Sequence, residues 1–120
     1  MVPFKMYHGP SKQCIFGAMD SAKKFSAAAV LVGNRSRAKI LWALMDDRAY
    51  TATELAGFAD LTRQAASNHL TKLIQGQLIV VEKQGRHRYF RLAGPEIAQS
   101  IEGIAGLIPQ YDLKKMKRPE

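Results

Sequence analysis

Amide and basic side chains are concentrated in residues 61–92. Gln64 and Asn68 lie four residues apart, so on a helix they share one face. Each amide can donate and accept a hydrogen bond at once, as pairing with adenine in the major groove demands. The stretch also suits phosphate, because it is strongly basic. Against one carboxylate, Glu82, it contains Arg63, Lys72, Lys83, Arg86, Arg88 and Arg91.

These residues fall on a predicted helix that is followed by a predicted β-hairpin. Apolar residues recur at helical spacing over residues 62–75, which predicts a helix capped by Thr62. Residues 78–83 and 88–92 are rich in β-branched, aromatic and basic side chains, and Gly85 stands in the short joint between them. The basic residues of the second half are therefore expected on a hairpin.

Two shorter helices are predicted upstream of this helix. Asn34 can cap the first of them. Thr51 and Glu54 form a T-x-x-E capping box that opens the second, which is expected to end near Asp60. The second short helix, the turn around Asp60 and the helix over residues 62–75 make a helix-turn-helix, and the hairpin that follows makes it winged.

The first and last helices of the chain are predicted to have apolar faces that need a partner. The first spans about residues 20–32 and is closed by Gly33, and the last begins at Pro95. The simplest burial is a two-fold homodimer, although both helices could instead complete the core of a monomer. The predicted dimer interface consists of Phe25, Ala28, Val32, Ile97, Ile101, Ile104 and Ile108.

Length and composition indicate one small basic domain. The chain has 120 residues, a formal net charge of +8 and a pI of about 9.9. Such a charge favours an acidic partner, either nucleic acid or an anionic membrane face. We predict a mostly α fold with a small antiparallel β-hairpin, divided into an N-terminal arm (1–19), a winged-helix DNA-binding and dimerisation domain (20–109) and a basic tail or linker (110–120).

The single cysteine, Cys14, excludes an intrachain disulfide and fits the reducing cytoplasm, which is the expected location. The longest apolar run, residues 27–32, is far too short to span a bilayer, so no membrane partner is expected. Met19 is a plausible alternative start. The ending KKMKRPE resembles a linker, which suggests a form cut from a longer two-domain regulator.

Three motifs in order resemble the ArsR family of bacterial winged-helix repressors. They are VGNRSRAKIL, TATELAGFADLTRQAASNHLTKL and GRHRYFRL, and together they cover residues 32–92, about half of the chain. The resemblance implies a homodimer that places two recognition helices in successive major grooves of an inverted-repeat operator in double-stranded DNA. It also implies that Arg63, Gln64, Ser67 and Asn68 lie on the exposed start of the recognition helix, with Arg86 and His87 at the wing tip.

The chemistry of the individual side chains refines this assignment. Ser67 and Thr71 are more suited to phosphate or backbone than to a base edge. Arg86 at a hairpin tip suits a minor-groove or phosphate contact, whereas Arg88 and Arg91 could instead solvate an edge strand. The predicted DNA-binding set is Thr62, Arg63, Gln64, Ser67, Asn68, Thr71, Lys72, Arg86, His87 and Arg88.

His69 is predicted to be structural, packing beneath the recognition helix or holding a phosphate, because no second metal ligand is near it in sequence. Tyr89 and Phe90 are interpreted as packing between wing and core rather than as platforms for stacked bases. We predict no metal site and no cofactor. Relatives that sense metal use cysteines at the start of the third helix, or Asp, His and Glu along the last. Here those stretches are RAYTATEL, which has no thiol, and PEIAQSIEGIAGLIP, which has neither His nor Cys.

Two turns depart from the glycine that the family commonly has. Asp60 tolerates a left-handed backbone, whereas Gln77 does so poorly. We therefore expect Gly76 to take the turn that ends the recognition helix. Cys14 is expected to be inert, since one thiol per chain could pair only with another chain or with a small thiol.

Three functions are alternatives to that of a DNA-binding repressor. A protein-interaction or dimerisation module would use the same scaffold without reading DNA. An enzyme is not expected, because the chain offers no converging acid, base or nucleophile and its aspartates are explained as helix ends. A third possibility keeps the fold but replaces DNA by RNA. The sequence identifies no effector.

Overall fold

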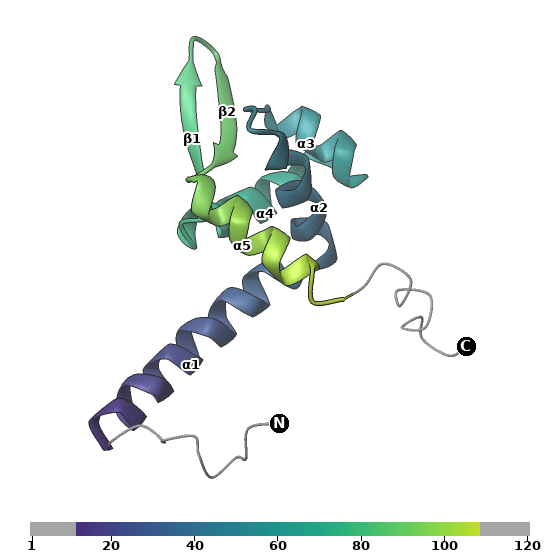
Figure 1. Ribbon diagram of the computed structural model, residues 1–120. Helices are drawn as coiled ribbons and strands as arrows, with labels where there is room; N and C mark the ends of the chain where they lie inside the picture. Colours follow the sequence, from purple (N-terminus) through teal and green to yellow (C-terminus); the bar gives the residue numbers. More distant parts are fainter. Residues whose placement is uncertain (1–11, 109–120) are drawn as a thin grey trace.

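The computed structural model describes residues 12–108, with side chains described from residue 19 onward. Over this range a β-hairpin is inserted before the last of five helices, so the predicted fold class is confirmed (Figure 1). The elements are α1 (Lys12–Val32), α2 (Arg35–Ala43) with a following 3-10 turn η2 (Leu44–Asp46), α3 (Ala52–Ala59), α4 (Arg63–Gln75), β1 (Ile79–Gln84), β2 (His87–Leu92) and α5 (Pro95–Ala105).

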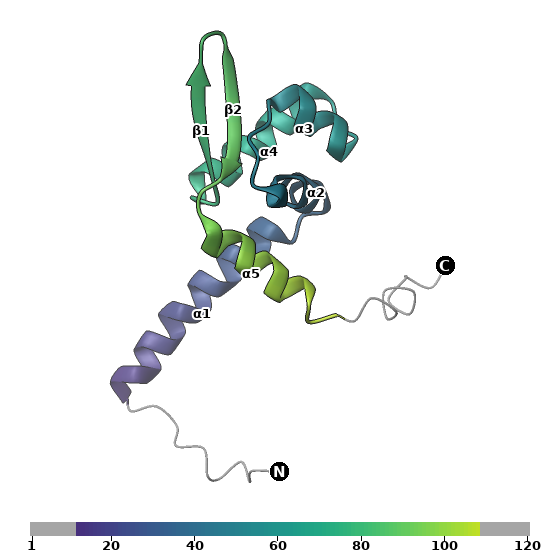
Figure 2. The same cartoon turned by 45° about the horizontal axis from the view of Figure 1, so that its top comes forward.

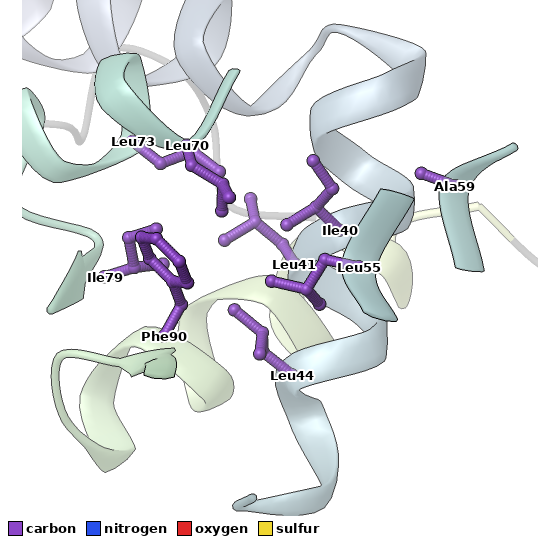
Figure 3. Packing of buried hydrophobic residues seen from close by; sticks show 9 residues of the cluster. All are labelled: Ile40, Leu41, Leu44, Leu55, Ala59, Leu70, Leu73, Ile79 and Phe90. Atoms are coloured by element: carbon purple, nitrogen blue, oxygen red, sulfur yellow. The ribbon is translucent and has the colours of Figure 1, made fainter. Parts of the chain in front are cut away.

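The core lies between α2, α3, α4 and the base of the hairpin (Figure 3). Each element turns its apolar face inward, as the period of its sequence requires. Fully burying one of these aliphatic side chains stabilises the fold by about 1.5–3 kcal/mol. The core residues are Ile40, Leu41, Leu44, Leu55, Ala59, Leu70, Leu73, Ile79 and Phe90.

Side chains cap the three central helices as predicted. The Asn34 side chain accepts a hydrogen bond from the Arg37 amide at 3.0 Å, and the Thr62 hydroxyl accepts one from the Ala65 amide at 3.1 Å. At the start of α3 both bonds of the capping box are present, with Thr51 as the N-cap. These local bonds satisfy amides that a helix start leaves without partners, which explains why the sequence located the starts correctly.

The end of α4 differs from the prediction. Gln77, not Gly76, has the left-handed backbone, with φ of 65° against –79° for Gly76. The Leu78 amide donates to the Leu73 carbonyl and the Gln77 amide to the Ile74 carbonyl, which is the Schellman pattern of helix ends. The missing side chain at 76 permits a close approach of Leu31 instead of serving the turn. A Cβ there would stand 2.1 Å from Cδ2 of Leu31 in α1.

The hairpin is joined to the rest of the domain through Tyr50. Strands β1 and β2 pair from Ile79 opposite Leu92 to Gln84 opposite His87, with Gly85 at φ of 63° in the turn. At the base, backbone hydrogen bonds of 2.9 and 2.7 Å link Tyr50 with Phe90. The segment before α3 therefore adds a third, single-residue strand partner and holds the wing beside α3.

Helices α1 and α5 lie outside this compact group (Figure 2). Helix α1 begins at Lys12 rather than near Asp20, so the predicted start was wrong. The periodic pattern begins near Asp20, but a helix that has formed is extended at little cost without such a pattern, here through Gly17 as well as the better helix formers Ala18 and Met19. Helix α5 begins at Pro95 as predicted and ends at Ala105, so Ile108 follows the helix instead of lying on it. Within residues 12–108, no helix is long and apolar enough to cross a membrane.

Candidate nucleic-acid interface

The outward face of α4 presents the amides that the sequence singled out. Arg63, Gln64 and Asn68 are exposed, and Ser67 is half-buried. Gln64 Nε2 donates to Asn68 Oδ1 at 3.2 Å. This bond uses one proton of Gln64 and one lone pair of the Asn68 oxygen, so each amide keeps a donor and an acceptor for an external partner. The two residues therefore form a prearranged donor and acceptor pair on one face.

Two threonines of α4 use part of their hydrogen-bonding capacity locally. The Thr71 hydroxyl donates to the Ser67 carbonyl at 3.0 Å, which agrees with the prediction that it prefers backbone or phosphate. The Thr62 hydroxyl accepts from the Ala65 amide, and its proton stays available as a donor. Lys72 is exposed beside Thr71. Thr62 at the start of α4, and Thr71 and Lys72 in its second half, are suited to phosphate rather than to base edges.

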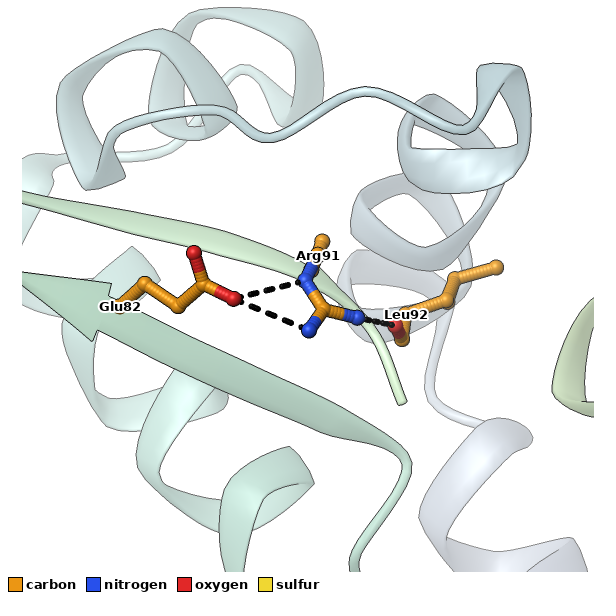
Figure 4. Close-up of polar contacts among 3 residues, drawn as sticks. All are labelled: Glu82, Arg91 and Leu92. Carbon is orange, nitrogen blue, oxygen red and sulfur yellow. Dashed lines mark hydrogen bonds and ion pairs between the residues drawn. The ribbon is translucent and has the colours of Figure 1, made fainter. Parts of the chain in front are cut away.

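The wing presents an exposed basic tip. Arg86, His87 and Arg88 are all exposed. Further down the hairpin, Arg91 donates to one Glu82 oxygen at 2.9 and 3.2 Å, and to the Leu92 carbonyl at 3.3 Å (Figure 4). Arg91 is thus engaged along the hairpin, which matches the alternative of an arginine that serves an edge strand. Such an exposed pair contributes about 0–1 kcal/mol to stability.

A cleft of about 500 Å³, lined mainly by arginine and hydroxyl side chains, joins α4 to the wing. It brings together five predicted residues from two elements, and it adds the first residues of α3, which sequence reasoning missed. At this helix start the Thr51 amide and hydroxyl already donate to the Glu54 carboxylate, which leaves the amides of Ala52 and Thr53 for an external anion. Gln64, Asn68, Thr71 and Lys72 lie along α4 outside the cleft lining. The lining consists of Thr51, Ala52, Thr53, Arg63, Ser67, Arg86, His87, Arg88 and Phe90.

His69 has a structural contact beneath the recognition helix, as predicted. Its Nδ1 lies 3.2 Å from Nη1 of Arg37, which can only donate, so this nitrogen accepts and the ring is neutral. Burial lowers the pKa of His69 below 6.5, and the nearby positive charges of Arg37 and Lys72 lower that pKa further. At neutral pH the ring therefore serves as an acceptor for Arg37.

The two wing aromatics differ in their environment. Phe90 is 7% exposed and belongs to the core, which confirms the prediction for this residue. Tyr89 is half-buried but absent from the core, and its ring centroid lies 6.3 Å from that of His87. Tyr89 thus packs along the wing, so the predicted packing between wing and core is wrong for this residue.

The predicted dimer residues are partly brought together. Val32, Ile101 and Ile104 line one apolar cleft of about 160 Å³ with residues of α2. Phe25 and Ala28 lie further out on α1 and are exposed, Phe25 at 74%. Ile97 is half-buried, and Ile108 is 39% exposed.

Metal ligands are scattered in the part of the chain with described side chains. From residue 19 to residue 108 no three His, Cys, Asp or Glu residues gather into a group that could hold a metal ion. His8 and the side chain of Cys14 lie outside the described residues, so the prediction on Cys14 is untested.

The chain is similar in sequence to known helix-turn-helix proteins. Residues 32–82 match a family model described as a helix-turn-helix domain. Over 87 residues the chain is 46% identical to the uncharacterized HTH-type transcriptional regulator YdfF of Bacillus subtilis, a match that covers 72% of this chain and 38% of that protein. The chain thus spans well under half the length of this curated relative.

Solved structures share the fold. Reduced HlyU from Vibrio cholerae aligns with a TM-score of 0.68 at 24% identity, covering 78% of this chain and 98% of that one. The homodimeric winged helix-turn-helix domain of Mb0332 from Mycobacterium bovis, a possible ArsR-family regulator, aligns with a TM-score of 0.66 at 20% identity, covering 84% and 89%. The fold, with hairpin and flanking helices, is that of winged helix-turn-helix proteins.

Proposed function

We propose that this chain, a winged helix-turn-helix protein homologous to an HTH-type transcriptional regulator, is a sequence-specific DNA-binding regulator of the ArsR type. The cleft between α4 and the wing is the observation that supports this most strongly. It places Arg63 of the helix and Arg86 and Arg88 of the hairpin around one concave surface. A curved basic surface beside an exposed polar helix suits a duplex groove and its flanking phosphates.

In this proposal α4 enters the major groove and reads bases through Gln64 and Asn68. Their mutual hydrogen bond fixes both side chains on the exposed face before DNA arrives. Either amide can make the two-point contact that distinguishes adenine from other bases. Arg63 precedes them at the helix start and suits a guanine edge or a phosphate.

Phosphate contacts come from the wing and from the start of α3. Arg86, His87 and Arg88 follow the hairpin tip, and Thr51 and Thr53 face the same cleft from the opposite side. Contacts of this kind hold the protein in register on the duplex but discriminate little between sequences. They supply affinity that falls steeply with salt.

The active form is proposed to be a homodimer joined through α1 and α5. Exposed apolar side chains are found on both helices, including Phe25 and Val30 on α1 and Ile104 on α5. A two-fold dimer would read two half-sites about 34–36 Å apart, one helical turn of DNA. Bound at a promoter in the cytoplasm, such a dimer would act as a repressor by blocking polymerase.

A salt titration of binding to random-sequence duplex DNA tests this function. We expect wild-type affinity to fall steeply with salt, and Arg86→Ala to flatten that slope because it removes one phosphate contact. Arg91→Ala is the matched control, since Arg91 is engaged with Glu82 and should leave the slope unchanged. A wild-type slope near zero would rule the function out.

A protein-interaction module is the second candidate, and the outer surface of α2 and α3 favours it. Trp42 and Phe58 are 56% and 57% exposed and line an apolar cleft of about 590 Å³. Arg35 and Lys39 also line it, so an acidic segment of a partner would fit best. Trp42 is the single tryptophan of the chain, so its fluorescence would report such binding without DNA.

A further inference from the structure

The end of α1 is attached to the recognition helix through Arg37. This residue is 8% exposed and lies on α2, between the two other helices. Its Nε donates to the Leu31 carbonyl at 2.6 Å, and its Nη2 donates to the Val30 carbonyl at 3.3 Å. Its Nη1 donates to His69 on α4. One guanidinium therefore caps α1 and bonds α4 at the same time.

A second contact joins α1 to the far end of α4. The Leu31 side chain lies over Gly76, where an added Cβ would stand 2.1 Å from Leu31 Cδ2. Gly76 has an ordinary right-handed backbone, so its lack of a side chain serves this close approach and not the turn. Leu31 thus meets α4 where that helix ends.

Together the two contacts fix the direction of the α1 axis relative to α4. His69 and Gly76 are seven positions apart in sequence, which on a helix separates them by roughly 10 Å. One attachment point would let α1 pivot, whereas two such points hold its axis relative to α4. Side chains from Met19 to Val30 are exposed, so the described part of α1 is held to the body mainly at this end.

We propose that the Arg37–His69 and Leu31–Gly76 contacts set the spacing between the two DNA half-sites. They would do so by fixing the direction in which α1 leaves the reading domain, which consists of α2, α3, α4 and the hairpin. The inference rests on the proposed function, in which α1 belongs to the dimer interface. Neither contact needs to touch DNA, so these four are positioning residues. They would determine specificity through the distance between two recognition helices.

Geometry makes the spacing sensitive to this direction. Helix α1 has 21 residues and is therefore roughly 32 Å long. A tilt of about 6° at one end moves the other by about 3.4 Å, which is the rise of one base pair. A small loss of constraint at the attachment thus changes which operator spacing fits the dimer best.

Gly76→Ala tests the proposal directly, because the added methyl must displace Leu31. The probes are duplexes built from the half-site that wild type selects from a random pool, with the spacer changed one base pair at a time. A second probe contains one half-site alone. We expect wild type to prefer one spacing. Gly76→Ala should shift or flatten that preference. Its affinity for the single half-site should stay within about twofold of wild type, because the substitution lies away from the proposed DNA contacts.

Gly57→Ala is the matched control, since a Cβ at Gly57 meets no atom within 4 Å. It should keep the wild-type spacing preference. Adding Leu31→Ala to Gly76→Ala removes the clash together with the contact, so Arg37 remains as the one attachment and the spacing preference should flatten rather than return to wild type. Arg37→Lys gives the same comparison if Gly76→Ala fails to fold, because lysine keeps the charge but cannot bond both carbonyls and His69 together.

The outcomes separate this inference from the function on which it rests. An unchanged spacing preference in folded Gly76→Ala, or an equal loss on single and paired half-sites, would overturn the positioning role. A wild type that selects no sequence at all would instead overturn the proposed function.

Discussion

The reading domain, formed by α2, α3, α4 and the hairpin, differs from the flanking helices α1 and α5 in how much of its apolar surface the chain itself buries. In the reading domain, Leu55, Leu70 and Leu73 are at most 1% exposed, and α3, α4 and the hairpin close around them. On α1, by contrast, Phe25 is 74% and Val30 is 71% exposed. The difference indicates that the surface proposed to read DNA is complete within one chain, whereas the flanking helices have exposed apolar faces that a second copy would bury in the proposed dimer.

The largest expected effect comes from comparing Leu70→Ala in the core with Phe25→Ala on the exposed face of α1. Leu70→Ala should reduce the free energy of unfolding by about 2–5 kcal/mol, because it leaves a cavity in the core. Phe25→Ala should leave the unfolding of the monomer nearly unchanged and weaken the dimer instead. Urea unfolding at low protein concentration and sedimentation over a concentration series measure the two quantities. Equal losses of monomer stability would contradict the division.

The second prediction separates the contribution of α4 to DNA binding from that of the wing. Asn68→Ala should lose about 1–3 kcal/mol of preference for the cognate operator over a single-base variant, because a two-point base contact disappears. Arg86→Ala should weaken binding to all sequences about equally. Fluorescence anisotropy on both duplexes separates the two effects. Similar losses on both duplexes for both variants would show that α4 and the wing do not divide the work.

The third prediction concerns the start of α3, which belongs to both core and cleft. Thr51→Ala should reduce stability by about 1 kcal/mol, because the Glu54 amide loses its capping acceptor. It should also weaken DNA binding. Thr53→Ala is the control, since Thr53 lines the same cleft without being the cap, and it should affect binding with little change in thermal unfolding. A stable Thr51→Ala would contradict the role of the cap.

The smallest expected effect is a dependence of stability on pH through His69. Its folded pKa lies below the unfolded value of about 6.5, so the unfolded chain binds the proton more readily. Stability is therefore full above pH 6.5 and falls as pH drops through the folded pKa. Urea melts of wild type and His69→Gln at several pH values measure this. A wild-type curve that rises on acidification would contradict a neutral His69.

Local features of the fold could be predicted from the sequence, and contacts between distant segments could not. Asn34, Thr51 and Thr62 cap their helices as predicted, because each cap depends on residues within the next turn. The sequence assigns Gly76 to the turn, whereas in the structure its missing side chain makes room for Leu31, which is distant in the chain. The periodicity of α1 likewise gave no sign of a start at Lys12.

The candidate site was predictable to a similar extent. Helical spacing placed Gln64 and Asn68 on one exposed face, and the hairpin placed Arg86 at its tip. The part played by Thr51 and Thr53 could not be foreseen, because it depends on how the wing packs beside α3. The backbone pairing of Tyr50 with Phe90 holds the wing there, and no local pattern announces it.

Selection of bound sequences from a random pool of duplex DNA tests the central claim most directly. We expect recovery of an inverted repeat whose half-sites lie about one helical turn apart, with base preference reduced in Gln64→Ala and Asn68→Ala. Recovery of no common sequence, or of a single unrepeated site that is bound equally well by both variants, would contradict it.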